Sequence, residues 1–280
     1  MITDKDLVLV TGGTGFTGSH LLEKLNQTGC ALRVIARETS DISAFDAMQI
    51  EWQIGDVFSP SLVKKAMNGV NYVFHVAAAY REPKIDDTVY NNVHVESTKL
   101  LANEAINQRR FKRFVHVSTV GVLGHIDNPP ADEDAEYNPG DIYQATKAEA
   151  EKWILQFAKE QGLPITVVRP AAIYGPGDRR LLKLYKVAKL PIIPLIGFSQ
   201  GMYHLIHVED LVRFMLYVSG HQGAVGNVYI CGSPNPVSIK EIIAHISQCL
   251  GRSGKFIRIP AWPVFLLGDL CELILQAAEY

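Results

Sequence analysis

The sequence predicts an α/β protein: a doubly wound parallel sheet followed by a smaller, irregular C-terminal lobe. Over residues 1–170, short apolar or β-branched runs alternate with longer segments of helical period. This alternation is typical of parallel strands joined by crossover helices. Beyond residue 170, Pro176, Pro191, Pro194, Pro234 and Pro236 interrupt the alternation. We therefore expect two domains, at residues 1–170 and 171–280, with the second completing a ligand cleft.

The expected strands of the first domain are short and mostly apolar, and lie at 6–11, 31–36, 50–54, 71–75, 113–117 and 165–169. The first of them, DLVLVT, has the continuous apolar centre of a strand that is covered on both faces. Helical patterns lie between the strands, at 15–28, 88–108 and 141–161. In the C-terminal lobe we expect helices near 179–190, 208–219 and 238–250, and one strand at 227–231.

The composition excludes several classes of function. Of the 280 residues, 48% are hydrophobic and 20% are charged, and the net charge is −2. These values are typical of a soluble globular protein and offer no basic surface for nucleic acid. The first strand begins too early to leave room for a signal peptide, and the four cysteines are far apart. We expect reduced core thiols in a cytoplasmic protein. The nine histidines lack an HExxH context, so no metal site is expected.

A glycine-rich turn, TGGTGFTG at residues 11–18, joins the first strand to the first helix. Glycines in such a turn let the backbone approach a pyrophosphate, and the N-terminal amides of the following helix face the anion. Strand, turn and helix occur here in the order that a Rossmann-type dinucleotide site requires. We therefore expect cofactor contacts from Gly12, Thr14, Gly15, Phe16 and Gly18.

The residue after the second strand bears on the choice between NAD and NADP. Enzymes that prefer NAD carry an acidic residue there, whereas this chain has Arg37, whose guanidinium suits a 2′-phosphate. NADP is therefore favoured over NAD, although the neighbouring Glu38 leaves a solvated surface arginine as the alternative. Asp56 and Val57 follow the third strand. A carboxylate there could accept the adenine amino group, or could simply serve the turn.

A tyrosine and a lysine begin the helix that is expected over 141–161, in the sequence YQATK at 143–147. Positions i and i+4 share one face of a helix. Lys147 could therefore hold ribose hydroxyls while its charge lowers the pKa of the Tyr143 phenol toward working pH. The fifth strand ends in Ser118 and Thr119, and the Thr119 hydroxyl would be a second donor to a substrate oxygen. The alternative is a surface helix in which neither residue does chemistry.

Further motifs extend along the chain, namely GDV at 55–57, FHVAAAY at 74–80, NNV at 91–93, VST at 117–119, RPAAIYGPGD at 169–178 and HVEDL at 207–211. Together with the glycine turn and YQATK, they make the chain resemble the extended short-chain dehydrogenases/reductases, also called the NAD-dependent epimerase/dehydratase family. The resemblance implies a catalytic Ser/Thr, Tyr and Lys, which fall on Thr119, Tyr143 and Lys147, with Ser118 able to share the role of Thr119. It also implies a homodimer, and nicotinamide contacts from Ala77, Ala78, Pro170 and Ile173.

Within that family, the LRVIARETSD segment resembles the dihydroflavonol-4-reductase and 3β-hydroxysteroid dehydrogenase branch. The family's 4,6-dehydratases need an acid pair directly after the catalytic Thr, where this chain has Val120 and Gly121, so dehydration is disfavoured. We expect hydride transfer between NAD(P) and a carbonyl or secondary alcohol of a small, fairly apolar substrate. Tyr80, Leu123 and Tyr174 would line its pocket. A nucleotide-sugar epimerase and a non-catalytic NADP-binding redox sensor are the alternatives.

Two further expectations concern less specific features. The resemblance places Asn92 inside the long helix, as a structural or proton-relay group. The apolar stretch at 261–275 is too short to span a bilayer, and we expect it to pack against the core or serve as a lid. Relatives in the family generally continue beyond such a segment, so part of the substrate lobe is expected to be missing.

Overall fold

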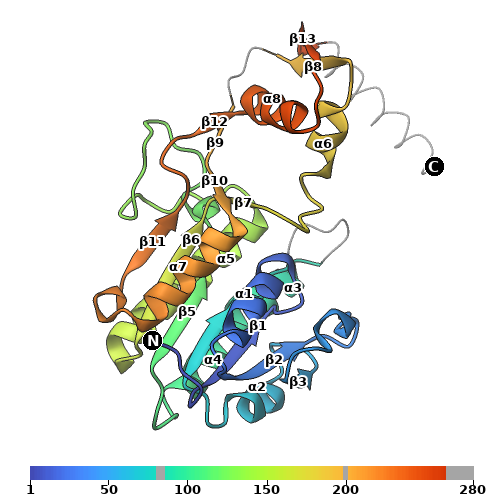
Figure 1. The fold of residues 1–280 in the computed structure, drawn as a ribbon. Helices are drawn as coiled ribbons and strands as arrows, with labels where there is room; N and C mark the ends of the chain where they lie inside the picture. Colours follow the sequence, from blue (N-terminus) through green and yellow to red (C-terminus); the bar gives the residue numbers. More distant parts are fainter. Residues whose placement is uncertain (80–85, 198–200, 263–280) are drawn as a thin grey trace, which may run out of the picture. The chain divides into compact units, whose positions relative to one another are not determined.

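The computed structural model describes residues 1–79, 86–197 and 201–262. The chain divides into two units (Figure 1). The first comprises Met1–Gly175 and Ile206–Gly232, and the second comprises Pro176–Leu205 and the chain from Ser233 onward. Residues 206–232 thus lie in the first unit, although the sequence places the domain boundary at residue 170. The reason is that a strand and a helix from this segment return to the sheet of the first unit.

The first unit is built on a seven-stranded sheet with the order β11-β6-β5-β4-β1-β2-β3 (Figure 1). Its strands are β1 (Leu7–Thr11), β2 (Ala31–Ala36), β3 (Ile50–Ile54), β4 (Tyr72–His75), β5 (Arg113–Val117), β6 (Ile165–Pro170) and β11 (Val228–Cys231). Every neighbouring pair is parallel. The strand order reverses at β1, because β2 lies on one side of it and β4 on the other. In such sheets ligands bind beyond the carboxyl ends of the strands at that point.

Helices cover both faces of this sheet, which confirms the doubly wound α/β fold (Figure 1). On one face lie α1 (Phe16–Asn26) and α7 (Val208–Gly220), and on the other α2 (Pro60–Met67), α4 (Ser97–Ala105) and α5 (Ile142–Gln161). Successive strand residues point to opposite faces: Val8 and Val10 pack on the α1 side, and Leu9 packs on the α2 side. Because both faces are buried, the strands are apolar almost throughout.

The helix predicted over 88–108 is interrupted by a π-helical segment. It begins as α3 (Asp87–Asn91), continues through the π-helical residues Asn92–Glu96 and ends as α4. Asp86 caps its start by accepting the N–H of Thr88 at 2.8 Å. A π turn widens the helix locally and rotates the side chains that follow it. His94, in the middle of this segment, is fully buried.

The second unit is smaller and irregular, as the sequence predicts. Its described residues form two helices, α6 (Leu182–Ala188) and α8 (Ile239–Cys249), and two small sheets that pair β8 (Ile192–Ile196) with β13 (Lys255–Ile259) and β9 (Met202–Tyr203) with β12 (Val237–Ser238). Ala188, Ile193 and Ile243 form its buried core. The four strands were not anticipated: β9 and β12 have only two residues each, and β8 contains Pro194, which argues against a strand.

Three smaller findings complete the fold. At the end of the main sheet β7 (Ala172–Tyr174) pairs with β10 (Leu205–His207). Cys30 and Cys231 are buried as expected, but Cys249 is exposed because it is the last residue of α8; Cys271 lies outside the described residues. No helix in the described ranges is both long and apolar enough to cross a bilayer.

Candidate active site

The glycine turn between β1 and α1 packs closely against the backbone that follows β4. Gly12 has a φ of +70°, and a Cβ there would lie 2.7 Å from the backbone nitrogen of Ala77. A Cβ on Gly18 would lie only 2.1 Å from the carbonyl oxygen of Gly12. Both positions therefore require glycine. Gly15 is the N-cap of α1, which has neither a side-chain cap nor an acidic residue in its first turn. The first N–H groups of α1 can thus donate hydrogen bonds to an anion, and a dinucleotide pyrophosphate fits this turn.

We expect Gly18→Ala to weaken both folding and nucleotide binding. The new methyl group would overlap the Gly12 carbonyl, so the free energy of unfolding should fall by about 1–3 kcal/mol. Displacement of the turn should weaken dinucleotide binding by about tenfold or more. Urea unfolding and a fluorescence titration with NADPH measure the two effects. The matched control is Gly140→Ala, whose Cβ would meet only a side-chain atom of Gln144 at 3.5 Å; equal behaviour of the two variants would contradict the packing argument.

The residues expected around the ribose and adenine lie on the same edge of the sheet. Thr14 Oγ1 donates to Ser40 Oγ at 3.3 Å, which ties the glycine turn to the segment after β2. Arg37 in that segment is exposed, and among the described residues its guanidinium forms no ion pair. Asp56 is exposed beyond β3, whereas the side chain of Val57 is buried in the core. Phe16 opens α1 with its ring edge-on to His20.

Helix α5 carries Lys147 to the carboxyl ends of β4 and β5. The Lys147 side chain is buried, and its Nζ donates to the carbonyl oxygen of Val117 at 3.0 Å and to that of Ala77 at 3.5 Å. Burial lowers the pKa of Lys147 to about 8, while the charge of Glu151, one turn further along the helix, acts in the opposite direction. Tyr143 lies one turn before Lys147 and is half-buried. The predicted pair thus occurs at the sheet edge that holds the glycine turn.

The lowered pKa of Lys147 makes the stability of the protein depend on pH. Between about pH 8 and the ordinary lysine pKa of 10.5, the unfolded chain binds one proton more than the folded chain. The free energy of unfolding therefore rises with pH in this window, and the cost of burying the ammonium is greatest below it. We expect Lys147→Met to gain most stability over the wild type below pH 8, and to lose that gain as the pH rises. Urea unfolding across the window tests this, with the exposed Lys159→Met as control; a gain that does not vary with pH would contradict it.

Ser118 and Thr119, which follow β5, differ in their surroundings. The Ser118 side chain is buried, and its Oγ has no hydrogen-bond partner among the described residues. Thr119 is half-buried and caps the 3-10 helix Val120–Leu123, with its Oγ1 accepting the N–H of Gly121 at 3.1 Å. The Thr119 hydroxyl proton is then left for another acceptor. Because Thr119 is less buried than Ser118, it fits the expected donor to a substrate oxygen better.

The other residues that the resemblance implies occupy the ends of β4 and β6. Ala77 is buried and Ala78 is exposed, directly after β4. Pro170 ends β6 and is buried, whereas Ile173 on β7 is half-buried against the core on the α1 side. Of these residues, Ala77 lies against the glycine turn, next to Gly12.

The whole chain is similar to known proteins. The model of the NAD dependent epimerase/dehydratase family matches residues 8–232. The chain belongs to this family. It is 26% identical over 276 residues to a UDP-glucose 4-epimerase of Vibrio cholerae, covering 94% of this chain and 81% of the relative. It is 28% identical to a 3-beta-hydroxysteroid dehydrogenase of Mycolicibacterium neoaurum, covering 92% of this chain and 74% of the relative.

A solved structure shares the fold. The NAD complex of dTDP-glucose 4,6-dehydratase from Bacillus anthracis superposes with a TM-score of 0.78, at 23% identity, over 91% of this chain and 84% of the other. Since the family consists of NAD-dependent epimerases, dehydratases and dehydrogenases, the chain is an enzyme of the extended short-chain dehydrogenase type.

Of the three residues expected to line the family's substrate pocket, two can be placed. Leu123 is buried in a small apolar cluster with Val122 and Ala148. Tyr174 on β7 is 37% exposed, and its ring lies edge-on to that of His207 at 5.2 Å. Tyr80 lies outside the described residues.

Sequence reasoning missed a histidine next to the expected catalytic tyrosine of this family enzyme. The rings of His94 and Tyr143 lie edge to face, with their centroids 5.3 Å apart. Asn92, which was expected to be the polar group of this helix, is half-buried at the start of the π-helical segment. A regular α-helix over 88–108 gives no signal for His94, because the π-helical segment changes which residues face inward.

Sequence reasoning also missed a buried ion pair that fixes α5 to the sheet. Arg169 on β6 donates from Nε and Nη2 to Glu151 Oε1 at 2.9 and 2.7 Å. Tyr137 donates its hydroxyl to the same oxygen at 2.8 Å. Burial, followed by the Glu151 charge, raises the pKa of Tyr137 to about 12. Tyr143, Lys147 and Glu151 are four residues apart in turn, so this pair anchors the helix face that carries the expected catalytic side chains.

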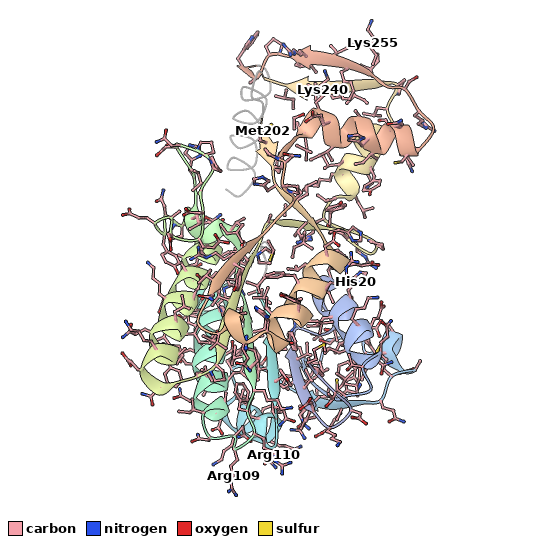
Figure 2. The ribbon with its side chains drawn as sticks, turned by 60° about the vertical axis from the view of Figure 1, so that its left-hand side comes forward. His20, Arg109, Arg110, Met202, Lys240 and Lys255 are labelled. Atoms are coloured by element: carbon pink, nitrogen blue, oxygen red, sulfur yellow. The ribbon has the colours of Figure 1, made fainter. Side chains whose placement is uncertain are left out.

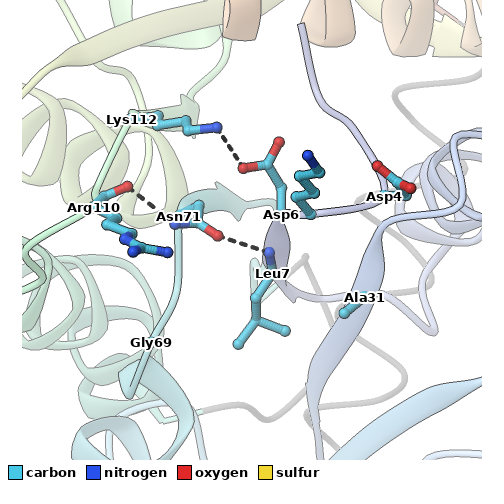
Figure 3. A pocket seen from close by; sticks show the side chains of 9 residues that line it. Asp4, Asp6, Leu7, Ala31, Gly69, Asn71, Arg110 and Lys112 are labelled. Atoms are coloured by element: carbon cyan, nitrogen blue, oxygen red, sulfur yellow. Dashed lines mark hydrogen bonds and ion pairs between the residues drawn. The ribbon is translucent and has the colours of Figure 1, made fainter.

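A separate hollow lies at the amino ends of the strands and holds none of the expected residues. Figure 2 shows Arg109 and Arg110 at one end of the first unit, away from the glycine turn. The hollow at this end is lined by the residues drawn in Figure 3. Two of its polar side chains are held within the protein: Asn71 accepts the N–H of Leu7 and donates to the carbonyl of Arg110, and Lys112 pairs with Asp6. We regard these contacts as structural.

Proposed function

We propose that the chain is an NAD(P)-dependent oxidoreductase that transfers hydride between the nicotinamide and a carbonyl or secondary alcohol of a small, fairly apolar substrate. One observation carries this proposal. Lys147, one helical turn from Tyr143, is buried with its Nζ on the carbonyl of Val117, two residues before Thr119. When bound, the nicotinamide would supply or accept the hydride. The protein would transfer the proton and hold the substrate oxygen by hydrogen bonds.

Each of the three side chains has a distinct part in this proposal. In the direction of reduction Tyr143 donates its phenolic proton to the substrate oxygen, and in oxidation it accepts that proton. Thr119 donates a hydrogen bond to the same oxygen. The positive charge of Lys147, one helical turn away, favours the phenolate that Tyr143 becomes when it gives up its proton. A Lys147 pKa of about 8 leaves the ammonium charged in most molecules at neutral pH.

The cofactor is proposed to be NADP rather than NAD. Gly12, Gly15 and Gly18 fit the pyrophosphate, as the close approach of the turn to Ala77 supports. Arg37 is exposed beyond β2, where a guanidinium favours a 2′-phosphate. The relative from Mycolicibacterium neoaurum acts, by its name, on a 3-beta-hydroxysteroid, which supports an apolar alcohol or ketone as substrate.

A second candidate is a nucleotide-sugar epimerase. The similarity to the UDP-glucose 4-epimerase of Vibrio cholerae over 94% of this chain favours it.

We also propose a cytoplasmic homodimer. Trp153 and Phe157, which stack 4.8 Å apart and half-buried on α5, are consistent with a partner there; light scattering in solution tests it.

Assays of the purified chain with NADPH and NADH separate these functions. Consumption of NADPH with hydrophobic ketones, and its formation from the matching alcohols, is the result expected of the proposed oxidoreductase. Interconversion of UDP-sugars without net change in the nucleotide would show an epimerase instead. Tight nucleotide binding without turnover of any ketone, aldehyde or UDP-sugar would show a redox sensor and contradict both enzymatic proposals.

A further inference from the structure

The hydrogen bonds of His94 determine which of its nitrogens carries the proton. Nε2 lies 3.0 Å from the backbone nitrogen of Ala79, and Nδ1 lies 2.8 Å from Thr146 Oγ1. An amide N–H can only donate, so Nε2 must be unprotonated and the ring proton must reside on Nδ1. Thr146 Oγ1 can accept a hydrogen bond from Nδ1–H, because its own hydroxyl donates to the carbonyl of Ile142 at 2.8 Å.

The same ring contacts the expected catalytic tyrosine. His94 presents its ring at 83° to that of Tyr143, with 5.3 Å between the centroids, which is a favourable edge-to-face arrangement. One side chain in the π-helical segment thus joins three parts of the site: the backbone after β4, the first turns of α5 and the Tyr143 ring.

We propose that His94, as the neutral Nδ1–H tautomer, is a positioning residue that sets the Tyr143 ring against the backbone of residues 77–79. This inference rests on the proposed catalytic role of Tyr143. A phenylalanine in place of His94 would keep the ring contact but leave the buried N–H of Ala79 without a partner. An imidazolium would carry a proton on Nε2 and lose the same bond.

The surroundings of His94 keep the ring neutral. Lys147 faces it from α5 and His75 from β4, and the rings of Tyr90 and Tyr143 complete the enclosure. Burial, followed by the charge of Lys147, lowers the pKa of His94 to about 2. The ring is therefore neutral at neutral pH, and both of its hydrogen bonds persist there.

The tautomer can be read directly, without any assay of turnover. Long-range ¹H–¹⁵N spectra of the full chain, labelled on histidine nitrogens, distinguish Nδ1–H from Nε2–H rings. The His94 signals are assigned as those missing from His94→Phe. We expect the Nδ1–H pattern, unchanged between about pH 6 and about pH 8 where an ordinary histidine titrates. An Nε2–H pattern, or a titration in that range, would overturn the proposal.

Kinetics of two threonine variants test the positioning role. Thr146→Val removes the acceptor of the His94 proton, and we expect it to lower kcat about tenfold or more while the Kd for NADPH changes little. Thr146→Ser should restore kcat. The matched control is Thr98→Val: Thr98 is also buried and its hydroxyl donates to the backbone carbonyl of His94 at 2.6 Å, but it does not bind the ring.

Two outcomes separate this inference from the proposed function. Equal kcat values for Thr146→Val and Thr98→Val would remove the positioning role and leave the catalytic role of Tyr143 intact. Full turnover in Tyr143→Phe would remove the proposed function and with it the positioning role, while the spectra would still decide whether His94 makes its two hydrogen bonds.

Discussion

Replacing Tyr143 with phenylalanine is expected to lower kcat by about 10²- to 10⁴-fold while nucleotide binding changes little. The substitution removes only the phenolic hydroxyl, which in the proposed mechanism transfers the proton to and from the substrate oxygen. The ring and its edge-to-face contact with His94 are kept, and so is the buried Lys147. Steady-state turnover and an NADPH titration measure the two quantities on the same preparation.

The chain offers a matched control for this substitution. Tyr185 also precedes a lysine, Lys189, by four residues, but it is 44% exposed on the short helix α6 of the second unit. Tyr185→Phe should therefore leave kcat close to that of the wild type. If Tyr143→Phe retained full turnover, or if the two variants lost the same amount, the proton-transfer role of Tyr143 would have to be abandoned.

The largest expected effect on stability comes from breaking the ion pair between Glu151 and Arg169. Both side chains are buried, and Glu151 Oε1 accepts two hydrogen bonds from the guanidinium. Arg169→Met would leave the carboxylate buried without its cation, so we expect the free energy of unfolding to fall by about 3–5 kcal/mol. The loss arises from an unpaired buried charge, not from the absence of an attraction alone.

The double variant Glu151→Leu/Arg169→Met tests that reason. With both charges removed, most of the lost stability should return, because a buried ion pair and an apolar pair of similar size differ little in net free energy. Arg213→Met breaks a surface pair with Asp210 and should cost less than about 1 kcal/mol. Urea unfolding of the three variants decides the matter; a double variant as unstable as Arg169→Met would point to lost packing rather than to charge.

The boundaries of several strands were predictable because they depend on short-range pattern. β2, β3 and β5 begin and end at the predicted residues, since an apolar run between polar turns is a local property of the chain. The strand expected near 227–231 shows the limit. It forms as β11, but it joins the main sheet beside β6 instead of the second unit. Which sheet a strand joins depends on pairing with residues far away in the sequence.

The features of the expected site likewise divide into those that a local sequence pattern identifies and those that depend on the tertiary structure. The glycine turn and the spacing of Tyr143 and Lys147 could be identified from the sequence, because a tight turn and one face of a helix are set by neighbouring residues. Only the tertiary structure decided that Lys147 is buried against the end of β5, that Ser118 is buried whereas Thr119 is half-buried, and that His94 faces Tyr143. Burial, hydrogen-bond partners and pKa values arise from groups that the fold brings together, and no local pattern of residues encodes them.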